Sequence, residues 1–396
     1  MDVALSLPVL NFVFEQPGRV IFGRGRLGEL GEVAARLGSR AMLVTGRRFA
    51  RSSGYLEKLV NSLESAGLEV VVFAEVEPNP SLETVDRGAR LAASRGVDVV
   101  VGFGGGSPLD AAKGIAAVTG LGGRAADYLY PRTVEEGALP VVAAPTTTGT
   151  GSEVTRYAVL TDTDARRKVV MVGSALIPRA AVLDPEVTDY MPGRLVAGTG
   201  FDALSHAIEA FLSRRATQIS DLFAREAARL ILESLADAVR GSREAREVML
   251  YASMLAGVAI NHAGTTMVHG LGYYLTTHHD VHHGMANALL LPHVLEYYAG
   301  AAQDRVEELA QALGLGDWRG LVRRIVELED EVGIPDSLAV VGVNEAELDE
   351  MTRVAMTYRR NLENGPAAPS PEDVRRVYAS CLAGRRRLLE RISESS

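Results

Sequence analysis

The chain has 396 residues, of which 47% are hydrophobic and 23% are charged, and its formal net charge is −9 at pH 7. This balance excludes disordered, collagen-like and coiled-coil proteins, and the negative charge disfavours nucleic acids and anionic membranes as partners. The length predicts two domains, and the single cysteine, Cys381, excludes an internal disulfide and any zinc site built on several thiolates.

The first twenty residues carry no targeting signal. No basic region precedes their apolar stretch, and no small-residue cleavage site follows it. No window of about 18 uninterrupted apolar residues occurs, so a transmembrane helix is not predicted. We therefore expect a cytoplasmic protein without a membrane partner.

Short valine-rich runs alternate with helical segments over about the first 185 residues. The runs predicted as buried strands are 41–45, 69–73, 97–103, 139–144 and 180–184. Strands that alternate with helices indicate a parallel sheet covered by helices. Residues 156–172 are expected to add a hairpin.

The pattern of hydrophobic residues changes beyond about Tyr190. Nearly every later segment has helical periodicity, and no valine-rich strand interrupts it. We expect an all-helical second domain, with the boundary in segment 184–193. The predicted domains are residues 1–188 and 189–396.

A glycine-rich loop follows the third predicted strand. Gly104, Gly105 and Gly106 precede Ser107 and Pro108, residue types favoured at the N-cap and at the first position of a helix. Backbone amides at such a helix start, with no Cβ atoms in the way, favour binding of a phosphate. The alternative is a simple tight turn.

A second loop of this kind, APTTTGTGSEVT at 144–155, follows the next predicted strand. Two such loops at strand ends suggest one phosphate-bearing ligand laid across the edge of the sheet. Neither loop has the G-x-G-x-x-G pattern or the Walker pattern. An ordinary Rossmann dehydrogenase and a P-loop kinase are therefore not predicted.

All eight histidines lie between His206 and His293. Asp202 and His206 are four residues apart, so on a helix they share one face and can bind the same ion. With His269 and His283 they provide one carboxylate and three imidazoles, a donor set suited to Fe(II) or Zn(II). For the Asp202–His206 pair alone, a surface or capping pair is the alternative.

Five segments in sequence order closely resemble the iron-containing (group III) alcohol dehydrogenases: GGGSPLDAAK, PTTTGTGSEVT, GTGFDALSHAIE, VHGLGY and HHGMANALLLPHVLEYY. The resemblance runs from FGRGRLGEL at 22–30 to a closing segment that ends at Leu382. It implies an N-terminal α/β domain with a parallel sheet that binds a nucleotide, and a C-terminal helical domain that binds a metal, a dehydroquinate synthase-like arrangement. The metal is expected in the cleft between the domains.

The resemblance also implies individual site residues. The metal, Fe(II) with Zn(II) as the alternative, is expected on Asp202, His206, His269 and His283. The pyrophosphate loop of the cofactor site is expected at Gly105, Gly106 and Ser107. The contacts on the nicotinamide side are expected at Thr146, Thr147, Thr155 and Lys168, and Asn79 is expected near the cofactor.

The residues after the first predicted strand bear on the choice between NAD(H) and NADP(H). Relatives that prefer NAD tend to carry an acidic residue where this chain has Gly46, and Arg47 and Arg48 follow. Two arginines favour the 2′-phosphate of NADP(H). We therefore expect NADP(H) to be favoured over NAD(H); the alternative is that both arginines only face solvent.

The resemblance implies an oxidoreductase that interconverts a primary alcohol and its aldehyde by hydride transfer, with the metal polarising the substrate oxygen. Many relatives have a histidine four residues after the ligand that matches His269, where this chain has Tyr273. The proton relay is therefore open between Tyr273, His279 and ordered water. The alternatives on the same fold are a maleylacetate reductase-like enzyme and a non-redox dehydroquinate synthase-like lyase. The expected partners are a small alcohol or aldehyde and further copies of the chain, in a dimer or larger oligomer.

Overall fold

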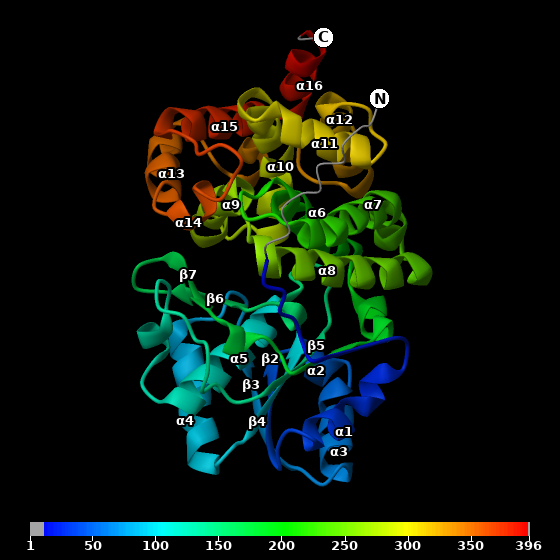
Figure 1. Ribbon diagram of the computed structural model, residues 1–396, viewed down its shortest axis with the longest axis vertical. Helices are drawn as coiled ribbons and strands as arrows, with labels where there is room; N and C mark the ends of the chain where they lie inside the picture. The colour runs from blue at the N-terminus through cyan, green and yellow to red at the C-terminus, as the bar shows by residue number, and fades with distance from the viewer. Residues whose placement is uncertain (1–11, 395–396) are drawn as a thin grey trace, which may run out of the picture.

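The computed structural model describes residues 12–394. Within this range the strands all precede Asp184, and everything from Gly193 onward is helical or loop. The two parts lie end to end along the long axis (Figure 1). We refer to residues 12–190 as the sheet half and to residues 193–394 as the helical half.

Six parallel strands form the sheet, in the spatial order β1-β8-β5-β4-β2-β3. Their bounds are β1 (Arg19–Phe22), β2 (Arg40–Gly46), β3 (Glu69–Val76), β4 (Val99–Gly104), β5 (Val141–Pro145) and β8 (Ala180–Leu183). The central strands β4 and β5 are buried along their whole length, because helices cover both faces. The five predicted strands are confirmed, and β1 is an edge strand that the valine-rich pattern did not reveal.

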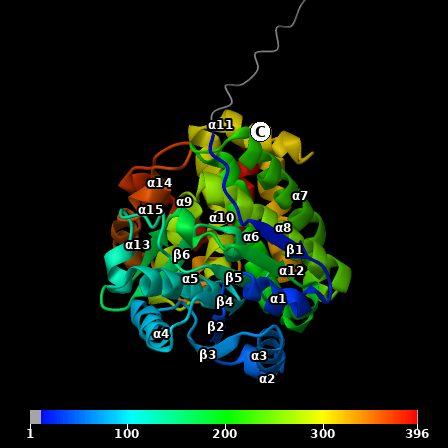
Figure 2. The ribbon, with the colours of Figure 1, turned by 60° about the horizontal axis from the view of Figure 1, so that its bottom comes forward.

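Helices cover both faces of this sheet (Figure 2). Their bounds are α1 (Leu30–Ala35), α2 (Phe49–Ser52), α3 (Tyr55–Ser65), α4 (Leu82–Arg95) and α5 (Gly106–Leu121). Successive side chains of a strand point to opposite faces. Met42 and Val44 therefore pack with α4 and α5, whereas Ala41 and Leu43 pack with α1 and α3.

The predicted hairpin is also present. It consists of β6 (Tyr157–Asp162) and β7 (Arg167–Val172), which pair antiparallel as a separate two-stranded sheet. The hairpin lies at the end of the sheet half that faces the helical half (Figure 1). Its position brings residues of the sheet half close to the helices described next.

The helical half is built around α6 (Gly193–Leu212), which is buried on nearly every side from Val196 onward. The other helices are α7 (Gln218–Arg240), α8 (Arg243–Ala263), α9 (Met267–His278), α10 (His283–Ala301), α11 (Gln303–Ala312), α12 (Trp318–Val332), α13 (Leu348–Ala355), α14 (Arg359–Leu362), α15 (Pro371–Ala383) and α16 (Arg385–Glu394). None of the helices in the described part of the chain combines the length and the apolar character that a bilayer crossing needs.

Short 3-10 helices connect these elements. Their bounds are η1 (Arg26–Glu29), η2 (Ala125–Tyr128), η3 (Ser152–Val154), η4 (Ser174–Leu176), η5 (Pro185–Tyr190), η6 (Leu338–Val341) and η7 (Glu345–Glu347). Two of them matter for the site, because η3 lies near the end of the second glycine loop and η5 leads from the sheet into α6.

Candidate metal and cofactor site

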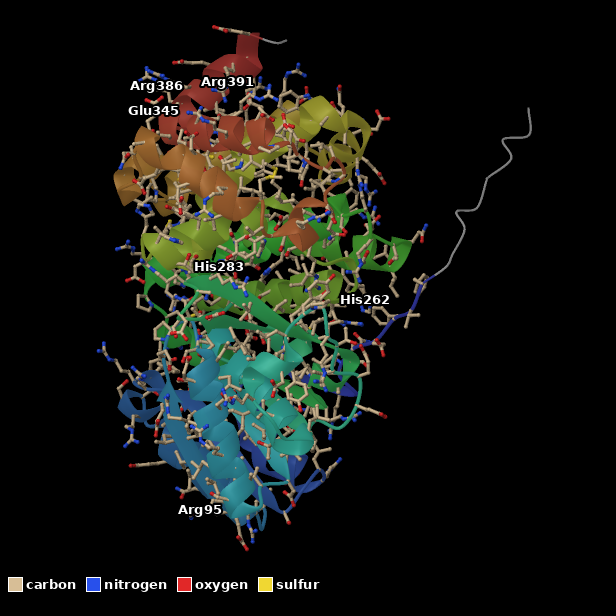
Figure 3. All side chains as sticks on the ribbon, turned by 90° about the vertical axis from the view of Figure 1, so that its left-hand side faces the viewer. Arg95, His262, His283, Glu345, Arg386 and Arg391 are labelled. Carbon is tan, nitrogen blue, oxygen red and sulfur yellow. The ribbon has the colours of Figure 1, made fainter. Side chains whose placement is uncertain are left out.

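The four predicted metal ligands come together from three helices. Asp202 and His206 lie on α6, His269 lies on α9, and His283 is the first residue of α10. Oδ1 of Asp202 is 3.7 Å from Nε2 of His269, 3.7 Å from Nε2 of His283 and 4.0 Å from Nε2 of His206. Figure 3 shows His283 at the level where the helical half faces the sheet half. Residues up to 81 positions apart in the sequence thus direct donor atoms at one point.

The charges of this cluster suit a divalent cation. Burial alone would raise the pKa of Asp202, but the imidazoles of His206, His283 and His269 outweigh that effect and lower it to about 2. Burial lowers the pKa of His283 to about 3 and also lowers that of His206. The carboxylate is therefore ionised and these two imidazoles are neutral at pH 7, as metal coordination requires. The donor set fits Fe(II) or Zn(II).

Asn287 is a further member of the cluster that the sequence analysis missed. It lies one helical turn after His283 on α10, and its Nδ2 donates to Oδ1 of Asp202 at 2.8 Å. The same Nδ2 is 3.3 Å from Nε2 of His269 and 3.2 Å from Nε2 of His283. The i, i+4 spacing from His283 was the available signal, because it puts both side chains on one helix face.

Glu209 was also missed, although it stands seven residues after Asp202 and so on the same face of α6. It is 1% exposed, and its Oε2 accepts a hydrogen bond from Nδ1 of His269. Burial alone would raise the pKa of Glu209, but His269 and Thr266 outweigh it and keep the pKa below its ordinary value. In return, Glu209 raises the pKa of His269 against the opposite effect of burial.

The structure separates the two side chains predicted as proton relays. The ring of Tyr273 stacks on that of His283, with centroids 5.7 Å apart, and burial raises its pKa. Nε2 of His279, just past the end of α9, is instead 2.8 Å from Oε2 of Glu347 on η7. Tyr273, and not His279, therefore contacts a predicted ligand.

The first glycine loop begins its helix earlier than predicted. Gly105 is the N-cap of α5 and Gly106 its first residue, so the expectation that Ser107 is the N-cap is wrong. Gly104, with a φ of 152°, lets the chain turn directly out of β4. The hydroxyl of Ser107 instead accepts a hydrogen bond from the backbone amide of Asn79 at 3.1 Å.

The two glycine loops lie side by side, as their positions after β4 and β5 predict. A Cβ atom on Gly105 would lie 3.1 Å from Cγ2 of Thr147, and one on Gly106 would lie 2.5 Å from Cγ2 of Thr150. The backbone amide of Thr146 also donates to the carbonyl of Gly104 at 2.9 Å. The glycines are thus needed for the close approach of the second loop to the start of α5.

Lys168 and Asn79 meet beside these loops. Nζ of Lys168 donates to Oδ1 of Asn79 at 2.8 Å and to Oγ1 of Thr161 at 3.2 Å, and burial lowers its pKa to about 8. Both residues line a pocket of about 220 Å³ between the hairpin and α9. The whole lining is Asn79, Thr161, Thr163, Arg166, Lys168, Thr276 and Thr277.

Thr155 lies deeper than the other predicted cofactor residues. Its hydroxyl accepts a hydrogen bond from Nζ of Lys113 at 3.1 Å, and the same Nζ donates to the carbonyls of Thr155 and Tyr157 at 2.9 Å and 2.7 Å. Lys113 is completely buried. It therefore fixes the end of the second loop from inside the protein.

The residues expected to select the cofactor follow β2. Gly46 has room for a side chain, since its Cβ would be 3.6 Å from Pro108, and Arg47 and Arg48 are both exposed. Nε of Arg47 donates to the carbonyl of Glu75 at 2.9 Å, and its Nη2 is 3.4 Å from Oε2 of Glu77. One arginine of the pair thus has a carboxylate neighbour that the local sequence did not reveal.

Comparison with known proteins identifies the family. The chain matches the model of the iron-containing alcohol dehydrogenases over residues 17–185, and that of the C-terminal part of the Fe-containing alcohol dehydrogenase family over residues 196–382. The chain belongs to the iron-containing alcohol dehydrogenase family. It is an enzyme that interconverts alcohols and aldehydes, an alcohol dehydrogenase or aldehyde reductase of the iron-containing type.

Individual members of the iron-containing alcohol dehydrogenase family are similar to this chain over most of its length. The NAD-dependent methanol dehydrogenase of Bacillus methanolicus is 35% identical over 94% of this chain and 100% of its own. The NADPH-dependent butanol dehydrogenase of Clostridium saccharobutylicum is 34% identical over 84% of this chain and 88% of its own. The crystal structure of an iron-containing alcohol dehydrogenase from Thermotoga maritima superposes with a TM-score of 0.85 at 36% identity, covering 94% of this chain and all of that one. The predicted fold class and enzyme class are thereby confirmed.

Proposed function

We propose that this iron-containing alcohol dehydrogenase interconverts a primary alcohol and its aldehyde by hydride transfer to or from a nicotinamide cofactor. A divalent metal, Fe(II) with Zn(II) as the alternative, would be held by Asp202, His206, His269 and His283. The observation that carries the proposal is that ligand atoms of Asp202, His269 and His283 all lie within 4.8 Å of one another. When bound there, the metal supplies Lewis-acid stabilisation of charge on the substrate oxygen.

The chain's own residues prepare the site for that chemistry. The ionised Asp202 provides the charge that attracts a divalent cation, and Asn287 orients its carboxylate. Nδ1 of His206 lies 3.2 Å from the carbonyl oxygen of Gly149, which joins the cluster to the second glycine loop. A complete ligand set favours the dehydrogenase over the maleylacetate reductase-like alternative.

The cofactor would lie along the edge of the sheet where β4 and β5 end. We assign its pyrophosphate to the start of α5, because the backbone amides and the helix dipole there attract an anion. The residues proposed to contact the cofactor are those predicted from the sequence, Asn79, Gly105, Gly106, Ser107, Thr146, Thr147, Thr155 and Lys168. Lys168 and Asn79, hydrogen-bonded to each other, would face the nicotinamide side.

The proton path is proposed to use Tyr273 or ordered water. Tyr273 remains protonated at neutral pH because burial raises its pKa, so its hydroxyl can donate a hydrogen bond next to His283. His279 is left out of the proposed path, since its Nε2 lies 2.8 Å from Oε2 of Glu347.

The metal assignment is tested by replacing single ligands. His269→Ala and His283→Ala are each expected to abolish metal retention and turnover together. A site of four ligands loses most of its affinity for the metal when one imidazole is removed. Elemental analysis of the purified variants and aldehyde reduction followed at the NAD(P)H absorbance are the measurements. Full turnover in a metal-free variant would refute the ligand assignment.

We also propose a preference for NADP(H), with Arg47 and Arg48 around the 2′-phosphate. The exposed guanidinium groups and the uncharged Gly46 support it, and the relatives include both an NAD-dependent and an NADPH-dependent enzyme. The ratio of kcat/KM for NADPH to that for NADH decides the question. A ratio below one would overturn this preference and leave the metal assignment intact.

Three broader features remain proposals. We place the boundary of the two domains between residues 188 and 189, within η5 and before α6. A cytoplasmic location is proposed from the single cysteine, and a homo-oligomer is proposed from the family resemblance. Light scattering coupled to size-exclusion chromatography measures the oligomeric state.

A further inference from the structure

Glu209 makes contacts with two different parts of the metal site. Its Oε1 accepts hydrogen bonds from the backbone amide of Thr266 at 2.9 Å, from the hydroxyl of Thr266 at 2.8 Å and from the backbone amide of Val268 at 2.9 Å. Its Oε2 accepts from Nδ1 of His269. One carboxylate thus fixes both the start of α9 and the ring of His269, the proposed ligand on that helix.

These contacts decide which nitrogen of His269 is available to a metal. An ionised carboxylate can only accept hydrogen bonds, so the proton between the two residues belongs to Nδ1. The lone pair that remains for coordination is on Nε2, which faces Oδ1 of Asp202 at 3.7 Å. A carboxylate behind a ligating histidine fixes the tautomer and the orientation of the ring.

The charges point in the same direction. Asp202 and Glu209 are both buried, 3% and 1% exposed, and in the described part of the chain neither forms an ion pair with a lysine or arginine. Buried charges of one sign are costly unless a counter-charge is present. The two carboxylates of Asp202 and Glu209 would balance the two positive charges of a divalent ion.

We propose that Glu209 is a positioning residue of the metal site, which acts through His269 by fixing its Nδ1–H tautomer and supplies the second negative charge. This inference rests on the proposed function, because it requires that Asp202, His206, His269 and His283 bind a metal. Glu209 itself does not touch the metal, the substrate or the cofactor.

Glu209→Gln is the discriminating substitution, because glutamine has nearly the same shape but only one acceptor oxygen. With that oxygen toward Thr266 and Val268, the amide group faces His269 as a donor and forces the proton onto Nε2. With the oxygen toward His269, the amide group meets the donors at the start of α9. The substitution therefore cannot satisfy both contacts, and either outcome weakens the site.

The experiment measures Co(II) affinity of the metal-stripped protein by competition with a chromophoric chelator, together with the visible absorption of the bound Co(II). We expect E209Q to bind Co(II) about 10–100-fold more weakly than the wild type and with an altered absorption spectrum. Glu329→Gln is the matched control, since Glu329 is an equally buried glutamate on α12, 2% exposed, that contacts Arg385 instead of the cluster. E329Q is expected to bind Co(II) as the wild type does.

A double-mutant cycle tests whether Glu209 acts through His269. A His269→Ala protein is expected to lose its metal during purification, so its weak Co(II) affinity is measured by direct titration at high added Co(II). In this background E209Q is expected to lose most of its effect on Co(II) affinity, because the side chain that it orients is absent. An equal loss in both backgrounds, or an E209Q affinity within twofold of wild type, would overturn the inference. Failure of the wild type to bind Co(II) would instead overturn the proposed function.

A folding defect would not leave the question open. If E209Q does not accumulate as folded protein by circular dichroism, Glu209→Asp gives the same measurement, because it keeps the charge but draws the carboxylate back from His269 by one methylene group. We expect weaker Co(II) binding there as well. Co(II) affinity equal to that of wild type in E209D would contradict the inference.

Discussion

The residues of the metal cluster differ in how far the sequence alone reveals them. Asp202 and His206 form an i, i+4 pair, and His269 and His283 belong to the group of histidines that all lie between residues 206 and 293. Glu209 and Asn287 stand on the same helix faces as the ligands, but helical spacing alone does not distinguish a glutamate or an asparagine that contacts a ligand from one that does not. Their roles depend on which atoms face them across α6, α9 and α10, and that information is tertiary.

The arginines after β2 give the residue-scale prediction on cofactor choice. Replacing both Arg47 and Arg48 by alanine is expected to lower kcat/KM for NADPH at least about tenfold, because charge-assisted hydrogen bonds to a phosphate contribute about 1.5–3 kcal/mol each. The value for NADH, which has no 2′-phosphate, should change little. Steady-state kinetics with both cofactors are the measurement.

Arg51→Ala provides the control for that pair. Arg51 is also exposed and lies three residues after Arg48, on α2. It should leave the NADPH to NADH ratio at the wild-type value. A double variant that retains the wild-type ratio would show that Arg47 and Arg48 only face solvent.

Among the elements, those with strong local patterns were predictable. The valine-rich strands and the hairpin lie where the sequence placed them. Burial on both faces leaves a continuous apolar run in β2, β4, β5 and β8, whereas β3 and the hairpin strands are only partly buried. Strand β1 was missed because four residues, of which two are exposed, carry no such pattern; β1 forms only because β8 offers it an open edge. The start of α5 was misjudged because Ser107 bonds Asn79 across the loop rather than its own helix.

The contact between the two glycine loops gives an element-scale prediction. Gly106→Ala is expected to weaken nucleotide binding about tenfold or more, because the new Cβ would lie 2.5 Å from Cγ2 of Thr150 and push the second loop off the start of α5. Overpacking of this kind also costs about 1–3 kcal/mol of unfolding free energy. Equilibrium binding of NAD(H) and NADP(H) and urea unfolding measure the two effects.

A second substitution at the same contact should restore nucleotide binding. Thr150→Ser removes the methyl group that Gly106→Ala would strike, so the double variant should recover most of the lost nucleotide affinity relative to T150S alone. If G106A binds nucleotide as the wild type does, the close approach of the loops is not needed for binding.

At the scale of the whole molecule, the seam between the sheet half and the helical half is tightly packed. Gly151 of the second loop lies against Gly257 of α8, where a Cβ on Gly151 would be 2.5 Å from the Cα of Gly257. Val154 of η3 packs with Leu250 and Val258 of the same helix. The sequence could indicate two parts of different character, but it could not show which surfaces they bury against each other.

This seam also buries ionisable groups, and Glu153 is 1% exposed within it. Burial raises its pKa to about 7 from an ordinary value of 4.5, with Lys113 acting in the opposite sense. The folded protein therefore holds the Glu153 proton more tightly than the unfolded chain does. Its stabilising contribution is present in full below about pH 4.5 and is lost as the pH rises through about 7.

Glu153→Gln is expected to remove this pH dependence. The free energy of unfolding of E153Q minus that of the wild type should be larger at pH 8 than at pH 5, by up to about 3 kcal/mol, because only the wild type loses stability as the pH rises. Urea unfolding of metal-stripped protein at both pH values is the measurement, with the exposed Glu57→Gln on α3 as the control. A difference between E153Q and wild type that is the same at both pH values would contradict the shifted pKa.

All four proposed ligands belong to the helical half, whereas the glycine loops, Lys168 and Asn79 belong to the sheet half. If the proposed function holds, the two reactants are thus bound by different halves of one chain, and hydride would pass across the seam between them. Under the proposed function, substitutions after β2 could therefore change the choice between NAD(H) and NADP(H) without touching any of the four proposed metal ligands.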